Sequence, residues 1–352
     1  MFTDRHRLEL PSLPTLANPQ LEAELIEIID QKTKPPGSLG RLESLAIQLG
    51  LILNSTSPQI VDPQIRVFAA DHGLTDEGVS AFPKAVTQQM VLNFLAGGAA
   101  INVFARQHNI ALKVVDAGVD GDFEPHPDLV SLKVMRGTRN SLTTSAMNAE
   151  ECMQAITCGM GLVREAPGNL LIVGEMGIGN TSASSLLLSK LGKLPIADCI
   201  GRGTGLDTAG LAHKEQVLTQ VLHKHRNLKN PLEILAAMGG LEVAMMVGAL
   251  LQAASQRRIL LIDGFIASSA LLVAEKLQPG VKDFAVFSHH SAEPGHSQLL
   301  KLLDATPLLD LQMCLGEGTG AAVAFPLLQS ALGFLNEMAS FTSAGVSNKP
   351  HV

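Results

Sequence analysis

The sequence predicts an α/β fold built on a doubly wound, mostly parallel sheet. Short apolar runs recur along the chain, each run stops at a glycine-rich or polar turn, and helical stretches alternate with the runs. A length of 352 residues allows one large α/β domain or two smaller ones.

Five apolar runs are predicted to be buried strands, because each is short and is closed by residues that favour turns. They are 67–70 before Asp-His-Gly, 112–115 before Asp-Ala-Gly, 170–173 before GEMGIGN, 259–262 before Asp-Gly-Phe and 284–287 before Ser-His-His.

Helical periodicity fills the intervals between these strands, at 86–107, 181–191, 214–224 and 241–255. The apolar stretch 234–254 is long enough to span a bilayer, yet it contains Glu242 and the pair Gly239-Gly240. We therefore expect a buried helix there and no membrane span.

The two ends of the chain differ from the middle. Helical patterns cover 20–31 and 42–53 around a KPPGSLG turn, and the sequence is again helical from 321 onward. We expect residues 1–60 and 322–352 to form a small helical subdomain, and residues 61–321 to form a large α/β domain that carries the active site.

Composition excludes several classes of partner. The net charge of −7 disfavours binding to nucleic-acid phosphates, and a chain with no Trp and no Tyr lacks aromatic platforms for bases or membrane interfaces. Only 17% of residues are charged and 46% are hydrophobic, which indicates surface buried between subunits. Four cysteines without a CxxC pair, and an amino terminus without an export signal, predict a cytoplasmic protein.

The segment Gly174–Thr181 (GEMGIGNT) has the spacing of a phosphate loop, with Asn180 where the lysine would stand. Backbone N–H groups of such a loop can hold a phosphate at a helix amino terminus, but the loop is poorly equipped for the β and γ phosphates of ATP. The spacing thus favours a monophosphate ligand, and a plain turn remains the alternative.

A second glycine-rich turn, Gly201–Gly205 (GRGTG), is followed by Lys214 in the next helix. The two turns and this lysine could surround one phosphate, with Lys214 supplying the charge that Asn180 lacks. A solvated lysine on a helix surface is the alternative.

Glu317 stands between glycines in a third turn (GEGTG) that opens onto an apolar helix. Apolar surroundings raise the pKa of a carboxyl group, which suits it to accept a proton, although a solvated turn glutamate is the other interpretation. Glu175 is a second carboxylate expected in the same crevice.

His289, His290 and His296 invite a metal interpretation, but their spacing is not that of a helical zinc pair, and Pro294-Gly295 places them in a loop. Histidines that line the crevice are the better hypothesis. With no acid pair after a strand, the sequence predicts a reaction without metal or cofactor.

Together these motifs resemble the nicotinate-nucleotide dimethylbenzimidazole phosphoribosyltransferase family over nearly the whole length. The resemblance rests on KPPGSLGRLE (34–43), FAADHG (68–73), GVSAFPKAVTQQM (78–90), GEMGIGNTSAS (174–184), GRGTGLD (201–207), SHHSAEPGH (288–296) and GEGTGAA (316–322). It implies a Rossmann-like large domain, a small helical domain and a homodimer.

The resemblance also implies a reaction, in which the phosphoribosyl group of nicotinate mononucleotide moves to 5,6-dimethylbenzimidazole and nicotinate is released. Glu317 would be the base, and Glu175 would lie near the ribose. The other implied contacts are Gly177, Gly179, Asn180, Thr181, Gly203, Thr204 and Lys214 for the phosphate, and Ser80, Gln88 and Leu315 for the benzimidazole.

Two rival functions differ from this one in testable ways. A kinase-like transferase would use the GEMGIGN loop on a triphosphate with Mg²⁺, and a nucleotide-sequestering module would have no use for Glu317. The preferred base among azoles and purines, and the roles of His72, His289 and His290, are not determined by the sequence.

Overall fold

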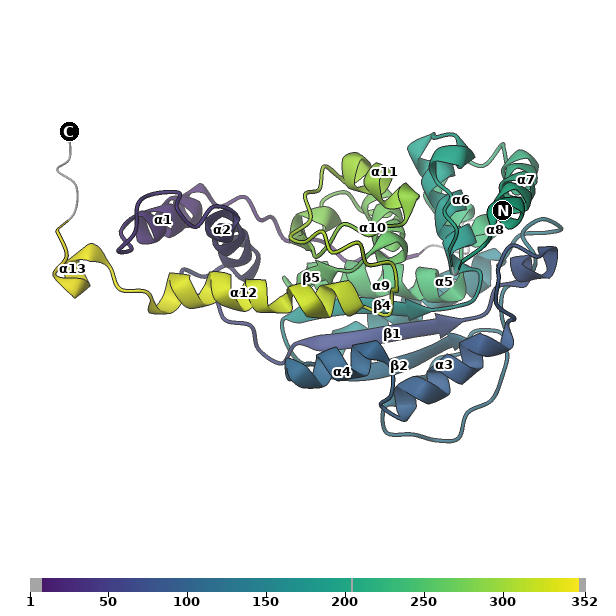
Figure 1. The fold of residues 1–352 in the computed structure, drawn as a ribbon, viewed down its shortest axis with the longest axis horizontal. Coiled ribbons are helices and arrows are strands. Elements are labelled where there is room, and N and C mark those ends of the chain that lie inside the picture. The colour runs from purple at the N-terminus through teal and green to yellow at the C-terminus, as the bar shows by residue number, and fades with distance from the viewer. Residues whose placement is uncertain (1–7, 204, 348–352) are drawn as a thin grey trace.

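A computed structural model describes residues 8–203 and 205–347. In this part of the chain six strands form one parallel sheet in the order β3-β2-β1-β4-β5-β6 (Figure 1). The order reverses between β1 and β4, as in Rossmann-type doubly wound sheets. The strands are β1 (Gln64–Ala70), β2 (Ala111–Gly118), β3 (Leu129–Ser131), β4 (Leu170–Met176), β5 (Ile259–Ile262) and β6 (Ala285–Phe287).

All five predicted apolar runs lie in strands, apart from Phe284, which ends the turn before β6. Every residue of β1 and of β5 is buried, because helices cover both faces of the sheet. The short edge strand β3 was not predicted. It holds only three residues, none of them fully buried, so it carries no continuous apolar run.

Helices lie on both faces of the sheet (Figure 1). One face contacts α3 (Ala85–Leu95), α4 (Ala100–Gln107) and α12 (Thr319–Glu337). The other is covered by α9, with α5 and α10 packed on it. The bounds of these three helices and of the helices next to them are α5 (Ala149–Arg164), α6 (Asn180–Gly192), α7 (Thr208–Lys224), α8 (Pro231–Met238), α9 (Leu241–Ser255), α10 (Phe265–Leu277) and α11 (Pro294–Leu303). Single 3₁₀ turns occupy Gly73–Glu77, Ile196–Asp198 and Val281–Phe284.

Two predicted helices were wrong in their continuity. The stretch 86–107 is divided into α3 and α4, since Gly97 adopts a left-handed φ of 77° and ends the first helix. The stretch 234–254 is buried as expected, but Gly239 and Gly240 separate α8 from α9. Among the described helices, none combines the length and apolar character that crossing a bilayer requires.

The α5–α9 contact explains two glycines of the core. A side chain at Gly159 would place its first carbon 1.9 Å from the carbonyl oxygen of Met245, and one at Gly248 would come equally close to that of Ile156. The two helix backbones therefore touch where they cross. This close packing fixes α9 against the sheet.

Helices from the first and the last parts of the chain lie side by side at one end of the molecule (Figure 1). Helices α1 (Pro19–Asp30) and α2 (Arg41–Leu53) pack on each other, and α2 packs along α12. Lys32 forms an isolated antiparallel bridge with Ser340, just before α13 (Phe341–Ala344). These contacts support the expected helical subdomain, and its boundaries at residues 60 and 322 stay a prediction.

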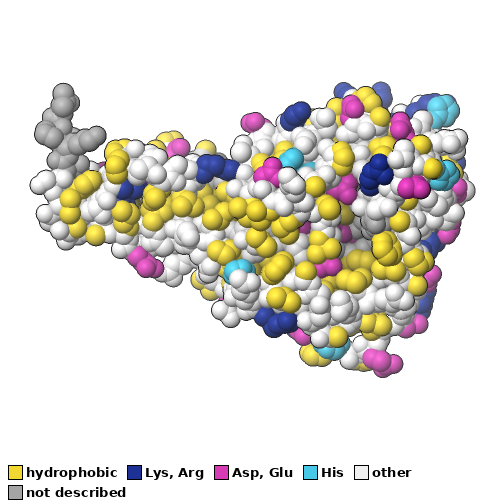
Figure 2. Space-filling model, in the orientation of Figure 1, with side chains coloured by type: hydrophobic (Ala, Val, Ile, Leu, Met, Phe, Trp, Pro, Cys, Tyr) yellow, Lys and Arg dark blue, Asp and Glu magenta, His cyan; other side chains and the backbone are white. Residues whose placement is uncertain are grey.

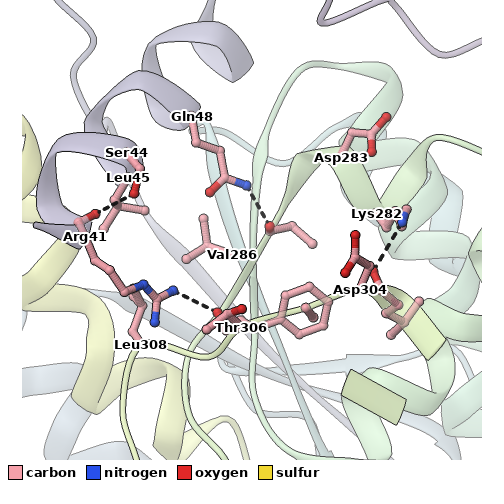
Figure 3. A pocket seen from close by; sticks show the side chains of 14 residues that line it. Arg41, Ser44, Leu45, Gln48, Lys282, Asp283, Val286, Asp304, Thr306 and Leu308 are labelled. Atoms are coloured by element: carbon pink, nitrogen blue, oxygen red, sulfur yellow. Dashed lines mark hydrogen bonds between the residues drawn. The ribbon is translucent and has the colours of Figure 1, made fainter. Parts of the chain in front are cut away.

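The outer edge of β6 is covered by α2. Gln48 donates a hydrogen bond to the carbonyl of Ala285 at 2.9 Å, and Arg41 donates to the carbonyl of Thr306 at 2.8 Å (Figure 3). A cavity of about 400 Å³ remains between them, and Lys282 and Asp304 also line it. None of the predicted site residues lines this cavity, so it is a seam between α2 and the large domain.

Candidate active site

The polar residues that follow the strands meet at the reversal point of the sheet. Asp71 and His72 follow β1, Glu175 lies near the end of the neighbouring β4, and Asp263 follows β5. All four are buried. In doubly wound sheets this carboxyl edge is where ligands bind.

The predicted phosphate loop has the expected shape. Gly179 has a left-handed φ of 98° and precedes Asn180, the first residue of α6, so the loop leads directly into a helix amino terminus. The loop and the 201–205 turn enclose a small cavity of about 20 Å³. Its lining is Val79, Ser80, Gly177, Gly179, Asn180, Thr181, Arg202, Gly203, Leu206 and Lys214.

This cavity has room for a group the size of one water molecule. A whole phosphate entering it has to displace part of the lining. Thr204, the remaining predicted phosphate contact, lies outside the described residues.

Lys214 reaches the cavity from α7 with a side chain that is almost wholly buried. Its ammonium group donates to the Thr181 hydroxyl at 3.1 Å and to the Gly201 carbonyl at 3.3 Å. Burial lowers the pKa of Lys214 to about 8, against the opposing attraction of Glu293. A buried ammonium group with two neutral acceptors is well suited to bind an anion.

Glu175 links the phosphate loop to the Glu317 turn. One of its carboxyl oxygens contacts the Asn180 amide nitrogen, and the other accepts a hydrogen bond from the Glu317 N–H at 3.4 Å. Because Asn180 also lines the phosphate cavity, two side chains link the backbone of the Glu317 turn to this cavity. The structure thus brings together the residues that the sequence placed in one crevice.

The Glu317 turn depends on glycines. A side chain at Gly174 would place its first carbon 2.1 Å from the Glu317 carbonyl oxygen, so the turn can lie directly on β4. Glu317 itself has a φ of 64°, an uncommon conformation for a residue with a side chain. Such local strain persists where the surrounding structure holds the residue firmly, and it is concentrated at functional sites.

Asp263 provides that hold. Its two carboxylate oxygens accept hydrogen bonds from the N–H groups of Gly318 and Ala321, both at 3.1 Å. These groups belong to the start of α12, where the helix dipole also favours a negative charge. Asp263 therefore fixes the turn that carries Glu317.

Both glutamates have pKa values raised towards neutrality. Burial raises the pKa of Glu317 to about 7, and the charge of Asp263 adds to the rise. Burial raises the pKa of Glu175 to about 8, with further contributions from Asp263 and Glu242. Near neutral pH, each carboxyl group can therefore exchange a proton, which is the property that a general base or acid needs.

The three predicted base contacts are less closely grouped. Ser80 lines the phosphate cavity. Gln88 is half-buried in α3 and donates to the Asp122 carbonyl at 3.2 Å. Leu315 is 58% exposed at the edge of the Glu317 turn. The last two do not line the phosphate cavity, so a base that contacts them would lie in the open part of the crevice.

The histidines after β6 are held by protein groups. His296 is buried, and its Nδ1 accepts from the Ser291 N–H at 2.8 Å, so its Nε2 donates to the Ser268 hydroxyl at 3.1 Å. Burial lowers the pKa of His296 to about 3, which keeps the ring neutral. His289 lies 3.5 Å from Asp263, and His290 contacts the Ser297 hydroxyl at 2.8 Å.

Sequence reasoning missed several residues of this site. Asp263 was noted only as a single carboxylate after a strand, and its hydrogen bonds to α12 depend on packing across 55 residues of sequence. Glu293 was not singled out, although it is half-buried and its charge acts on Lys214. The one available signal was the position of Asp263 directly after a predicted strand.

The fold and this site define a nucleotide-handling α/β enzyme. A helix amino terminus and a buried lysine face one small cavity, and two protonatable carboxyl groups lie beside it at the reversal point of the sheet.

Comparison with known proteins agrees. A family model described as phosphoribosyltransferase matches residues 15–346. Nicotinate-nucleotide–dimethylbenzimidazole phosphoribosyltransferase from Variovorax paradoxus is 56% identical over 340 residues, which cover 97% of each chain. The namesake from Parabacteroides distasonis is 45% identical, covering 93% of this chain and 96% of its own.

Among solved structures, CobT from Thermus thermophilus superimposes with a TM-score of 0.91 at 43% identity, covering 94% of this chain and all of the other. The chain belongs to the nicotinate-nucleotide–dimethylbenzimidazole phosphoribosyltransferase family. The family resemblance predicted from the sequence is confirmed, as is the Rossmann-like parallel sheet.

The raised pKa of Glu317 predicts a pH-dependent effect of Glu317→Gln. Between pH 4.5, the ordinary pKa of glutamate, and about pH 7, the folded protein keeps the Glu317 proton that the unfolded chain has lost. The free energy of unfolding therefore falls as the pH rises from 4.5 through 7. Glutamine removes this loss of stability. Relative to the unchanged protein, the variant should gain up to about 3 kcal/mol between pH 5 and pH 8, measured by urea unfolding.

Glu337→Gln, at the exposed other end of α12, is the matched control and should show no such gain. An equal stability difference for Glu317→Gln at both pH values would contradict the raised pKa.

Proposed function

We propose that this protein transfers the 5-phosphoribosyl group of nicotinate mononucleotide to 5,6-dimethylbenzimidazole, in cobalamin biosynthesis. The products are α-ribazole 5′-phosphate and nicotinate. The single observation that carries the proposal is the chain of contacts from the Glu317 backbone N–H through Glu175 to Asn180, which joins the turn bearing a candidate base to a candidate phosphate site. The names of the relatives supply the substrates.

The chemistry requires one bond to form and one to break at the anomeric carbon of the ribose. A ring nitrogen of the benzimidazole attacks this carbon, and the bond to the pyridinium nitrogen of nicotinate breaks. The pyridinium takes the bonding electrons and leaves as an uncharged ring. The azole N–H loses its proton, which needs an acceptor with a pKa near neutrality.

Glu317 is that acceptor in our proposal. Its pKa of about 7 leaves an ionised fraction at neutral pH, and Asp263 holds its turn in place. Glu175 would lie near the ribose, where its protonated form adds no further negative charge. The two carboxyl groups thus have different tasks because their surroundings differ.

The phosphate of the nucleotide would bind between the loop Gly177–Thr181 and the 201–205 turn. Lys214 supplies the positive charge, and the amino terminus of α6, whose dipole favours an anion, faces the same cavity. Asn180, in the place of a phosphate-loop lysine, is engaged with Glu175. This arrangement suits a single phosphate.

The benzimidazole would contact Ser80, Gln88 and Leu315. Such contacts discriminate weakly between flat bases, since one methyl group is worth about 1–3 kcal/mol.

We further propose that the protein is a cytoplasmic homodimer. Hydrophobic side chains gather on the surface over α12 (Figure 2). Leu92, Val103, Leu311 and Leu315 are each about half exposed. A second copy covering such a surface would shield them and would also close the crevice near Leu315. The four unpaired cysteines agree with a reducing compartment.

Glu317→Gln should reduce turnover by about 10² to 10⁴, because the azole proton loses its acceptor. The measurement is nicotinate released from nicotinate mononucleotide and dimethylbenzimidazole. The KM for the nucleotide should stay near that of the unchanged protein, and Glu337→Gln should be fully active. Near-normal turnover of Glu317→Gln would rule out the base, and no release by the unchanged protein would point to a non-catalytic binding module.

Lys214→Met should weaken binding of nicotinate mononucleotide by about 10- to 100-fold, since a hydrogen bond to a charged group is worth about 1.5–3 kcal/mol. Isothermal calorimetry measures the affinity directly. Lys224→Met, at the exposed end of the same helix, is the control. Undiminished affinity of Lys214→Met would mean that the phosphate binds elsewhere.

The double variant Leu92→Asp/Val103→Asp should be monomeric, because it puts two carboxylates on the surface assigned to the dimer. Analytical ultracentrifugation should give twice the 37.2 kDa chain mass for the unchanged protein and a single chain mass for the variant. Leu302→Asp, on α11, should stay dimeric. A monomeric parent would refute the proposal.

A further inference from the structure

His72 and Glu242 form a buried pair that the proposed reaction does not use. His72 follows β1, and Glu242 lies in the first turn of α9. The His72 Nε2 lies 2.7 Å from a Glu242 carboxylate oxygen, and the side chains are 2% and 0% exposed. Burial disfavours the charged imidazole, but the attraction of Glu242 outweighs this and raises the pKa of His72.

Glycines make room for this pair on two sides. A side chain at Gly240 would place its first carbon 2.4 Å from His72 Cε1 and 2.6 Å from a Glu242 oxygen. On the other side, the same carbon at Gly177 would be 3.4 Å from the ring, and at Gly179 it would be 3.2 Å from His72 Cβ. The space between the phosphate loop and His72 is therefore no wider than one carbon atom, beside the ring at Gly177 and beside Cβ at Gly179.

The turn after His72 strengthens this packing. The Thr75 hydroxyl and N–H both donate to the His72 carbonyl, at 2.6 and 3.2 Å. The methyl group of Thr75 faces Gly179, where a side-chain carbon would lie only 2.6 Å away. Loop and turn are thus packed against each other at two successive points.

A buried ion pair is a costly way to fill this space. Removing two charges from water often costs more than their attraction returns, so well-packed apolar residues would stabilise the fold at least as well. The second carboxylate oxygen of Glu242 moreover has no hydrogen-bond partner among the described residues. Packing alone therefore does not account for the pair, and its position beside the phosphate loop suggests a role in ligand binding.

We propose that His72 is a positioning residue for the nucleotide. Held by Glu242, its ring packs beside Gly177, and its Cβ packs with Thr75 beside Gly179, so that His72 sets the position of the loop when the phosphate binds. This inference rests on the proposed function, because it assigns the loop to the phosphate of nicotinate mononucleotide. It predicts that the pair affects nucleotide binding and leaves benzimidazole binding and the chemical step largely unchanged.

The test is a comparison of His72→Ala, His72→Asn, Glu242→Ala and Glu242→Gln in steady-state kinetics. His72→Ala and Glu242→Ala should raise the KM for nicotinate mononucleotide at least about tenfold, given that a displacement of about 1 Å in a site can cost about a hundredfold. Their kcat and their KM for dimethylbenzimidazole should stay within about threefold. Glu242→Gln keeps an acceptor for the ring and should largely restore nucleotide KM.

His225→Ala is the matched control. His225 is also buried and also bonded, to the Ser141 carbonyl at 2.9 Å, but it lies at the far end of α7. Its loss should lower the melting temperature without changing the nucleotide KM. Should His72→Ala fail to fold, His72→Asn carries the same prediction.

An unchanged nucleotide KM in a folded His72 variant would overturn the inference. So would a uniform loss in which kcat and both KM values change together, because that is the result of a merely structural role. If the unchanged protein itself releases no nicotinate, the proposed function fails instead. The affinity for inorganic phosphate, measured by calorimetry, then tests the support of the loop separately, and His72→Ala must still weaken it about tenfold.

Discussion

The site depends on the contact between the Glu175 carboxyl group and two separate turns. It bonds the Asn180 side chain on one side and the Glu317 backbone on the other. The contact is possible because β4 lies next to β1 at the reversal point of the sheet, and because Gly174 lets the Glu317 turn lie directly on the strand. The contact adds to the packing of the Glu317 turn on β4 and to its hydrogen bonds with Asp263, which hold the same turn from other sides.

The same contact explains the electrostatics of the crevice. Glu175 and Glu317 are buried in a region that also holds Asp263 and Glu242, and burial together with the neighbouring charges raises the pKa of both glutamates. Both can therefore retain a proton near neutral pH. Asp263 accepts hydrogen bonds from helix N–H groups, and Glu242 contacts His72.

Local patterns in the sequence were enough to predict most of the sheet and the turns of the site. Apolar runs ending at turns located five of the strands, because burial on both faces leaves a continuous signal, whereas the half-exposed β3 leaves none. The prediction of one helix over 86–107 was wrong, because the apolar periodicity continues across Gly97 whereas the helical conformation of the backbone ends there. The turns bearing Glu317 and Gly177 were found from their glycines.

The support of these turns could not be predicted. It depends on contacts between residues far apart in sequence, such as Asp263 with Gly318, and His72 with Glu242. The burial of Lys214 could not be predicted either, because the sequence pattern around a helical lysine is the same whether its side chain faces solvent or a cavity. The comparisons establish the family, and the residue roles remain proposals.

Helix α12 joins the catalytic turn to the far end of the molecule. It starts two residues after Glu317, runs for 19 residues or about 28 Å, and packs against α2 along the way. Pro326 removes one hydrogen bond from its interior and is a natural point of bending. Because α12 begins at the Glu317 turn and packs on α2, the length of this one helix fixes the separation between that turn and the amino-terminal helices.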